Sequence, residues 1–195
     1  MGKVTTGFSM SLDGFVAGPQ DEVDRVFKWY FDKATREVSS GNEVFKMSEE
    51  GADLIQEAGQ AAGVLVTARR TFDVAKAWGG KHPMNVPVVV VTHTVPREWV
   101  KEGSPFTFVT DGVESAIKKA KQIAGNQTVA VGAPSVVQQC LKAGLLDEIH
   151  IDLAPVLLFE GIRLFDHLGI KPVDLQITEV TATAGVIHMT FRVVK

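Results

Sequence analysis

The chain has 195 residues and a formal net charge of −3 at neutral pH, which gives no electrostatic reason to expect nucleic acid or an anionic membrane as a partner. Hydrophobic residues make up 45% of the sequence and charged residues 22%, the balance of a chain that buries a hydrophobic core. No apolar run approaches the roughly 20 residues of a membrane span, the N-terminus lacks the layout of a signal peptide, and the lone Cys140 excludes an internal disulfide, so we expect a cytoplasmic protein.

The first half of the chain predicts strands separated by loops and helices. In chain order we expect a strand over 4–10, a loop over 11–24, a short amphipathic helix or irregular segment over 23–35, a polar flexible insert over 36–50, a helix over 52–62, a buried strand over 64–68 and a helix over 71–78. Gly63 ends the helix over 52–62. Thr71 is expected to cap the next helix, which Gly79 and Gly80 end.

The second half repeats strand and helix and then becomes rich in strands. We expect strands over 86–93, 106–110, 128–131, 148–158, 175–184 and 185–194, one helix after a capping box at Asp111 and Glu114, and another from Pro134 to about Ala143. Repeated strand–helix–strand units imply an α/β fold with a mostly parallel sheet covered by helices on both faces, and the final pair of strands fits an antiparallel edge. Without a repeat or a linker, we expect one domain over residues 1–195.

Polar or small residues follow four of the predicted strands. These segments are 11–14, 68–71, 92–94 and 132–135. Open α/β sheets bind their ligands at the carboxyl ends of the strands. If the four strands are parallel neighbours, the four segments lie together along what we call the carboxyl edge.

The chemistry of the carboxyl edge suits a phosphorylated cofactor. Gly132 permits close approach of the backbone to a ligand, and a helix beginning near Pro134 directs N–H groups toward a phosphate. Arg69 and Arg70 are able to hold a phosphate monoester, which favours NADP over NAD, and Thr71 and Ser135 add hydroxyl donors. Taken singly, each feature also fits a plain turn or a solvated surface pair.

Other candidate residues give weaker signals. His150 and His188 lie in predicted strands and are able to face one another, but without a carboxylate partner they do not favour a metal site. Cys140 fits a small packed side chain, and Trp29 follows the first loop, where it would form a wall of a pocket. The sequence contains no G-x-S-x-G, H-E-x-x-H, Walker or G-x-G-x-x-G motif, which argues against hydrolases, zincins, NTPases and Rossmann dehydrogenases.

Several segments together resemble a known family. The runs SMSLDGFVAGP, TARRTFD, PVVVVTH and VAVGAPSVVQQCLKAGLLDEIHIDLAPVLLFEGIRLF resemble, in this order, the dihydrofolate-reductase-like family typified by the C-terminal reductase domain of bacterial riboflavin-biosynthesis deaminase–reductases. The resemblance covers about residues 3–193. It implies a central mixed, mostly parallel sheet of about eight strands with helices on both faces, and NADPH lying across the carboxyl ends of the strands.

The resemblance also implies roles for individual residues. Asp13 and Gly14 would border the nicotinamide and substrate pocket, with Asp13 as the acid that orients the substrate or a proton-donating water. From its place after the first loop, Trp29 is also expected to bind the substrate. Burial is expected to raise the pKa of Asp13 toward a useful value. The residues implied to bind the cofactor are Ala17, Arg69, Arg70, Thr71, Thr92, His93, Gly132, Ala133, Pro134 and Ser135.

The chain departs from the family pattern at Ala68, Ala133 and Phe159, where the family usually has glycine. A methyl group at Ala133 is expected to crowd the pyrophosphate, and Phe159 places a bulky ring near the substrate.

From the resemblance as a whole we expect an NADPH-dependent reductase of a small heterocyclic or carbonyl substrate. A ligand-binding protein that has lost NADPH, or a flavin-binding redox protein, stays open as an alternative. Exposed apolar strands in the C-terminal part predict a homodimer.

Overall fold

A computed structural model describes residues 2–31, 36–40, 43–166, 168–183 and 185–195. The strands are β1 (Val4–Ser11), β2 (Phe15–Ala17), β3 (Arg36–Ser40), β4 (Glu43–Met47), β5 (Ala62–Ala68), β6 (Val88–Val91), β7 (Phe106–Val109), β8 (Thr128–Val131), β9 (Glu148–Ala154), β10 (Ile162–Arg163), β11 (Leu175–Thr183) and β12 (Val186–Val193). The α-helices are α1 (Glu49–Ala61), α2 (Arg69–Val74), α3 (Val113–Ala124) and α4 (Pro134–Lys142), with short 3-10 turns η1 (Lys28–Tyr30), η2 (Lys76–Gly80) and η3 (Arg97–Trp99).

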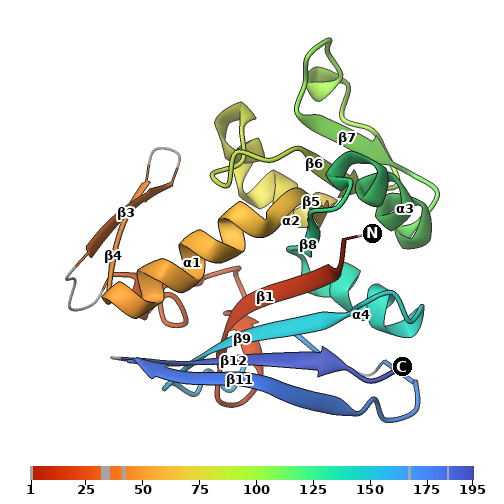
Figure 1. Ribbon diagram of the computed structural model, residues 1–195. Coiled ribbons are helices and arrows are strands. Elements are labelled where there is room, and N and C mark those ends of the chain that lie inside the picture. Colours follow the sequence, from red (N-terminus) through yellow and green to blue (C-terminus); the bar gives the residue numbers. More distant parts are fainter. Residues whose placement is uncertain (1, 32–35, 41–42, 167, 184) are drawn as a thin grey trace.

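Eight strands form the central sheet, which runs from bottom to top of Figure 1 in the order β11-β12-β9-β1-β8-β5-β6-β7. The six strands from β9 to β7 in this order are parallel. β12 pairs antiparallel with β9, and β11 pairs antiparallel with β12. The expected mixed, mostly parallel sheet with an antiparallel pair at one edge is confirmed.

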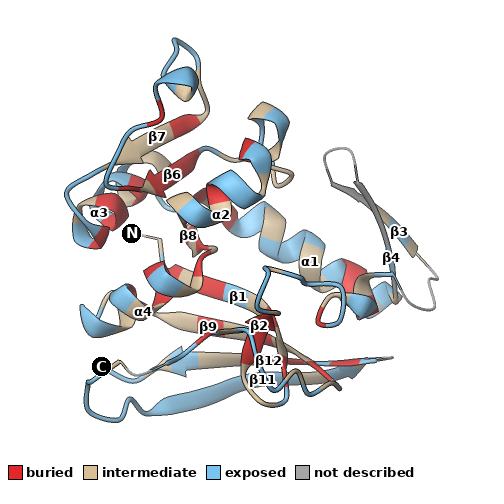
Figure 2. Ribbon diagram, turned by 180° about the vertical axis from the view of Figure 1, so that it is seen from behind, coloured by how far each residue is buried: buried red, intermediate tan, exposed pale blue. Residues whose placement is uncertain are grey.

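The core lies on both faces of the parallel strands. In β5, Val64 and Val66 pack with α3 and α4, whereas Leu65 packs on the opposite face with Phe72 of α2, as the two-residue period of a strand requires. Burial on both faces explains why β6 is an unbroken run of valines. Figure 2 contrasts this buried strand with β11, which is exposed along most of its length.

The prediction of a flexible insert over 36–50 is wrong for the residues that the structure describes, because most of them form two paired strands and the start of α1. β3 and β4 pair as an antiparallel hairpin, which projects from the side of the sheet in Figure 1. The guanidinium of Arg36 pairs with Asp53 and Glu49 of α1, so contacts with a helix later in the chain hold this polar segment. α1 begins before the expected residue 52 because Ser48 caps it by accepting a hydrogen bond from the N–H of Gly51. Residues 32–35 and 41–42 lie outside the described part of the chain.

Further boundaries also differ from those expected. Gly63 does not end a helix but lies within β5, because α1 ends at Ala61 and β5 begins at Ala62. α2 ends at Val74 rather than Trp78, since the backbone turns left-handed at Lys76 (φ +49°) and stays so to Gly80. Thr71 lies inside α2 and does not cap it, and Gly112 (φ +100°), rather than Asp111, is the N-cap of α3.

The last difference concerns β9, which ends at Ala154 instead of residue 158. Pro155 follows at once, and a proline has no N–H to donate to a strand pairing. No helix in the described ranges is both long and apolar enough to cross a membrane.

Candidate functional site

The strand order brings the four predicted segments to one edge of the sheet. β1, β8, β5 and β6 are parallel neighbours, so residues 11–14, 132–135, 68–71 and 92–94 follow one another along the carboxyl edge. The loop after β9 joins them, because β9 pairs parallel with β1 on the other side. The carboxyl edge is therefore built from segments far apart in the sequence.

Asp13 is held by the loop after β9. Its Oδ1 accepts hydrogen bonds from the Ser11 hydroxyl at 2.6 Å and the Leu158 N–H at 3.1 Å, and its Oδ2 accepts from the Phe159 N–H at 2.7 Å. Burial alone would raise the pKa of Asp13, but these hydrogen bonds outweigh it and lower the pKa to about 2. The expected raised pKa is wrong: Asp13 is ionised at neutral pH and has no proton to donate.

A two-stranded sheet fixes the residues that follow Asp13. β2 pairs antiparallel with β10, which places residues 159–163 beside residues 14–17. At Gly161 (φ +129°) a Cβ would lie 2.1 Å from the carbonyl oxygen of Ala17, so no side chain fits there. Ala17, an expected cofactor residue, is itself buried in this small sheet.

Arg163 of β10 closes the same turn. Its Nη1 donates to the carbonyl oxygen of Asp13 at 2.9 Å, and its guanidinium lies 4.2 Å from the centre of the Phe15 ring. Gly14, which has a φ of +90°, turns the chain beneath it. The sequence analysis did not single out Arg163, and only its place in the run EGIRLF gave a signal.

The two arginines after β5 already have acidic partners. Arg69 donates from Nε to both carboxylate oxygens of Asp73 at 2.8 Å and from Nη1 to the carbonyl oxygen of Thr94 at 2.9 Å. Arg70 pairs with Asp21 at 2.9 Å, which joins α2 to the first loop. Arg69 therefore stands beside the segment after β6, whereas Arg70 faces the loop after β1.

The turn after β8 uses its small residues for packing. A Cβ at Gly132 would lie 2.9 Å from Cδ1 of Leu65, so a neighbouring side chain explains this glycine. Ala133 is 1% exposed and belongs to the main core, and its carbonyl oxygen accepts the first hydrogen bonds of α4. In the described part of the chain, the N–H of the exposed Ser135, next to Pro134, donates to no acceptor, which leaves one donor directed outward at the start of α4.

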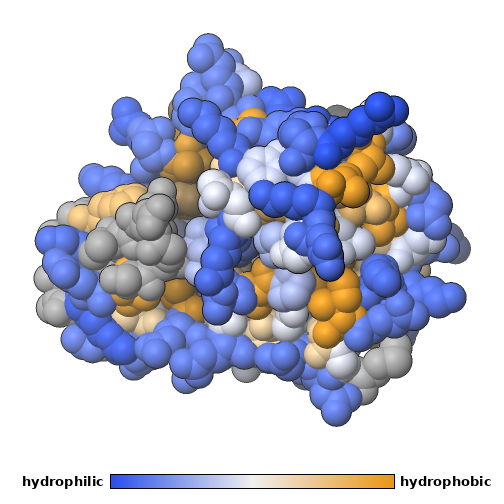
Figure 3. Space-filling view, turned by 90° about the horizontal axis from the view of Figure 1, so that it is seen from above, coloured by the Kyte–Doolittle hydropathy of each residue, from blue (hydrophilic) through white to orange (hydrophobic). Residues whose placement is uncertain are grey.

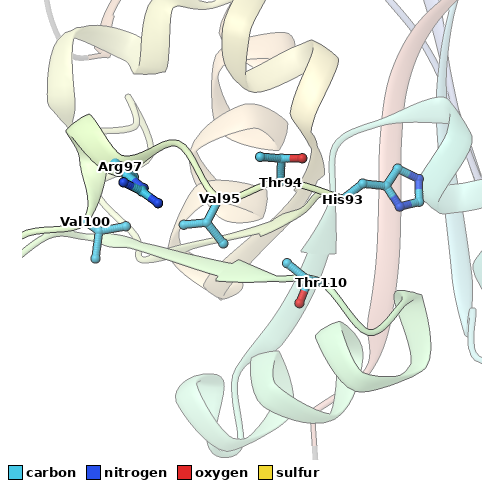
Figure 4. A pocket seen from close by; sticks show the side chains of 6 residues that line it. All are labelled: His93, Thr94, Val95, Arg97, Val100 and Thr110. Carbon is cyan, nitrogen blue, oxygen red and sulfur yellow. The ribbon is translucent and has the colours of Figure 1, made fainter.

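A broad hollow of about 720 Å³ opens at the carboxyl ends of β6 and β7. It is lined by His93, Thr94, Val95, Arg97, Val100 and Thr110 (Figure 4). Thr92 does not line it but shapes the turn, since its hydroxyl donates to the Thr94 carbonyl at 2.8 Å. Arg97 makes no ion pair within the described residues, and sequence analysis missed it because it lies beyond the strand end.

The upper end of the molecule in Figure 1 is seen face-on in Figure 3. Hydrophobic side chains are exposed there in separate patches among hydrophilic ones. The lining of the hollow has the same mixed character, with Val95 and Val100 beside His93 and Arg97. Such a surface suits a ligand that carries both a flat apolar part and an anionic group.

Trp29 and the two histidines lie over the other half of the sheet. Trp29 is buried and donates from Nε1 to the Ser9 hydroxyl at 2.9 Å. His150 and His188 do not face one another, since the register pairs His188 with Asp152 and His150 with Thr190. His188 thus has the carboxylate partner that we did not expect, with Nδ1 2.7 Å from Oδ1 of Asp152. The residues described include no group of three or more potential ligands suited to a metal ion.

The chain is similar to known proteins in sequence and in fold. The sequence matches the model of the RibD C-terminal domain over residues 2–189. It is 24% identical over 166 residues to the uncharacterized protein YwjB of Bacillus subtilis (strain 168), covering 85% of this chain and 84% of that protein.

Two solved structures have the same fold. A protein of Shewanella sp. PV-4 assigned to riboflavin biosynthesis superposes with a TM-score of 0.77 at 18% identity, covering 99% of both chains. Dihydrofolate reductase of Enterococcus faecalis, solved with NADP(H), superposes with a TM-score of 0.61 at 14% identity, covering 99% of this chain and 97% of that one. The expected dihydrofolate-reductase-like fold is confirmed.

Proposed function

Because this chain belongs to the family of RibD C-terminal domains, whose fold is that of reductases, we propose that it is an NADPH-dependent reductase of a small heterocyclic substrate. The observation that carries the proposal is the meeting of four strand ends and the loop after β9 at one carboxyl edge. Dihydrofolate reductase of Enterococcus faecalis, which has the same fold, was solved with NADP(H), and the similar protein of Shewanella sp. PV-4 is assigned to riboflavin biosynthesis.

The residues present fit a cofactor with several phosphates. The outward N–H of Ser135 at the start of α4 is a donor for a pyrophosphate oxygen. At the hollow, Arg97 has no ion pair among the described residues, and Arg69 reaches the lining residue Thr94. Two guanidinium groups beside one hollow suit the extra 2′-phosphate that distinguishes NADPH from NADH.

The buried methyl group of Ala133 does not oppose this proposal. It packs into the core, whereas a cofactor on the carboxyl edge would meet the outward side of the turn. When bound, NADPH supplies the hydride; the chain's own residues bind and orient both ligands and exclude water from them. Ionised Asp13 orders the loop after β9.

Calorimetric titration of the purified protein with NADPH and then NADH tests the proposal. We expect NADPH to bind at least 10-fold more tightly, and Arg97→Ala to weaken NADPH about 10-fold. NADH is the internal control, because it lacks the 2′-phosphate and its affinity should stay unchanged. Absence of binding by both nucleotides would refute the reductase proposal and favour the ligand-binding alternative, whereas a yellow protein that retains flavin would favour the flavin-binding one.

We also propose that the protein is a homodimer. Exposed apolar side chains on β11 and β12 include Leu175, Ile177, Val180 and Ile187. Ile177 and Val180 pair across the strands with Phe191 and Met189, which pack against the main core. The apolar surface of the core thus continues onto an uncovered sheet face that a second copy would bury. Light scattering at micromolar concentration should give a dimer for the native protein and a monomer for Ile177→Lys, and a native monomer would refute the proposal.

A further inference from the structure

Three polar residues form a row across β1, β9 and β12. The register pairs Ser9 with Asp152 and Asp152 with His188, so the three side chains project from the same face of the sheet. Ser9 lies two residues before the end of β1, and Asp152 two residues before the end of β9. The row is therefore just inside the carboxyl edge, where this fold binds its ligands.

Asp152 is anchored through one oxygen only. Its Oδ1 lies 2.7 Å from Nδ1 of His188, and Nε2 of His188 lies 3.2 Å from the Thr183 hydroxyl. Both ring nitrogens are thus occupied, and the imidazole is fixed in place. Across the described ranges, Oδ2 of Asp152 receives no hydrogen bond, although its side chain is only 20% exposed. Among the described residues, only Oγ1 of Thr67 is a buried side-chain polar atom without a partner, so Oδ2 of Asp152 is accessible to a ligand or to water.

Aromatic rings pack beside His188, the partner of this carboxylate. The Trp29 ring lies edge-on to His188 with 5.1 Å between centroids, and Tyr30 packs on Trp29 at 4.0 Å. Burial raises the pKa of Tyr30, and the negative charge of Asp152 raises it further. Tyr30 is therefore within electrostatic reach of the carboxylate. Flat rings beside a hydrogen-bonding group are the features that a planar heterocycle requires.

The other side of Asp152 is open. Gly7, the next residue of β1 on the same face, pairs with His150 and is exposed. A Cβ placed on Gly7 would have His150 Cβ, 3.7 Å away, as its nearest neighbour. The missing side chain in a central strand leaves room above the sheet beside the row.

We propose that Asp152, positioned by His188, recognises an amino N–H donor carried by the heterocyclic substrate through its unused oxygen. The inference rests on the proposed reductase function and assigns its substrate site. It gives Asp152 the substrate-orienting role expected of Asp13, whose oxygens are instead occupied by the loop after β9. Trp29, which packs against His188, keeps its expected place beside the substrate.

Two small probes of equal shape test the proposal. Calorimetry with 2,4-diaminopyrimidine and 2,4-dimethylpyrimidine, both in the presence of NADPH, compares a ring with N–H donors and a ring without them. One charge-assisted hydrogen bond predicts a preference of about 10- to 100-fold for the diamino ring. The preference should fall to near 1 in Asp152→Asn and to an intermediate value in His188→Gln. A merely structural defect would weaken both probes alike and leave their ratio unchanged.

Glu148→Gln is the matched control, because it makes the same carboxylate-to-amide change on the same face of β9, about 13 Å from Asp152. It should keep the native preference. A preference unchanged in Asp152→Asn, or a native protein without preference, overturns the assignment. Nucleotide titration is read separately: native protein that binds the diamino probe but not NADPH refutes the reductase proposal and, with it, the role of this site in reduction. If Asp152→Asn fails to fold, the probe ratio in His188→Gln decides.

Discussion

Phe159 has a left-handed backbone, and replacing it with glycine should stabilise the protein. Its φ is +67°, a conformation that costs an L-residue about 1–2 kcal/mol relative to glycine. Glycine offsets part of this gain, because it raises the conformational entropy of the unfolded chain, which costs about 0.4–1 kcal/mol of stability. The Phe159 N–H to Asp13 is a backbone donor and survives the change. Removal of the ring also forfeits about 0.5 kcal/mol of burial, so the net expectation is a gain of up to about 0.5 kcal/mol, or up to about 2 °C in Tm for a chain of this size.

Phe159→Ala separates the backbone effect from the loss of the ring. The ring is 78% exposed, so its removal forfeits only about 0.5 kcal/mol of burial, and alanine keeps the left-handed strain. Thermal and urea unfolding of the three proteins give the comparison. If Phe159→Gly is no more stable than Phe159→Ala, the backbone at residue 159 is not strained and the reasoning is refuted.

Three further predictions concern the loops and a partly buried histidine. Gly161→Ala should lower the free energy of unfolding by about 3 kcal/mol or more, measured in urea, because its Cβ would overlap the Ala17 carbonyl; an unchanged midpoint would contradict the packing. The pKa of Asp13 is depressed from 3.8 to about 2, so its contribution to stability is present above pH 4 and lost as the pH falls toward 2. Asp13→Asn should reduce this loss of stability in acid, measured by urea unfolding at several pH values. An unchanged loss would show that the hydrogen bonds from Asp13 to the loop after β9 do not form. Burial lowers the pKa of His82 from 6.5 to about 4, so stability present above pH 6.5 is lost as the pH falls through 4; His82→Gln should reduce this loss, and the native slope persisting in the variant would exclude His82 as its source.

The parallel part of the sheet was predictable because most of its strands are short apolar runs, which the sequence alone reveals. The run 86–93 indicates a strand buried on both faces, and β6 lies within it. The boundaries were harder to predict, since they depend on local backbone geometry. The left-handed residues from Lys76 to Gly80 end α2 early, and a helix pattern read from side-chain spacing contains no such signal.

Long-range contacts explain what the sequence left hidden. Asp13 reads as a turn residue, but its hydrogen-bond partners lie 145 and 146 residues later. The hairpin of β3 and β4 depends in the same way on ion pairs from Arg36 to α1. A polar segment without such partners would have the same composition, so composition predicted a flexible insert.

The row of Ser9, Asp152 and His188 did leave a signal. Residues 148–153 alternate between charged or polar and apolar side chains, which places Asp152 on a polar face, and residues 186–193 place His188 on a polar face of β12. What the sequence could not provide is the register between the two strands, because a shift by one residue would turn every side chain to the opposite face. The pairing of Asp152 with His188 is therefore a structural finding.

The departures from the family pattern have different physical meanings. At residue 133, the methyl group packs in the core and takes up no space at the carboxyl edge. At residue 159, the backbone keeps a conformation that suits glycine although the residue is Phe, because the adjacent N–H groups of Leu158 and Phe159 are held by Asp13. The Asp13 carboxylate thus holds the loop after β9 in a left-handed conformation that Phe159 disfavours. A site whose loop geometry is maintained at this cost argues for a retained ligand-binding function rather than a fold that has merely persisted.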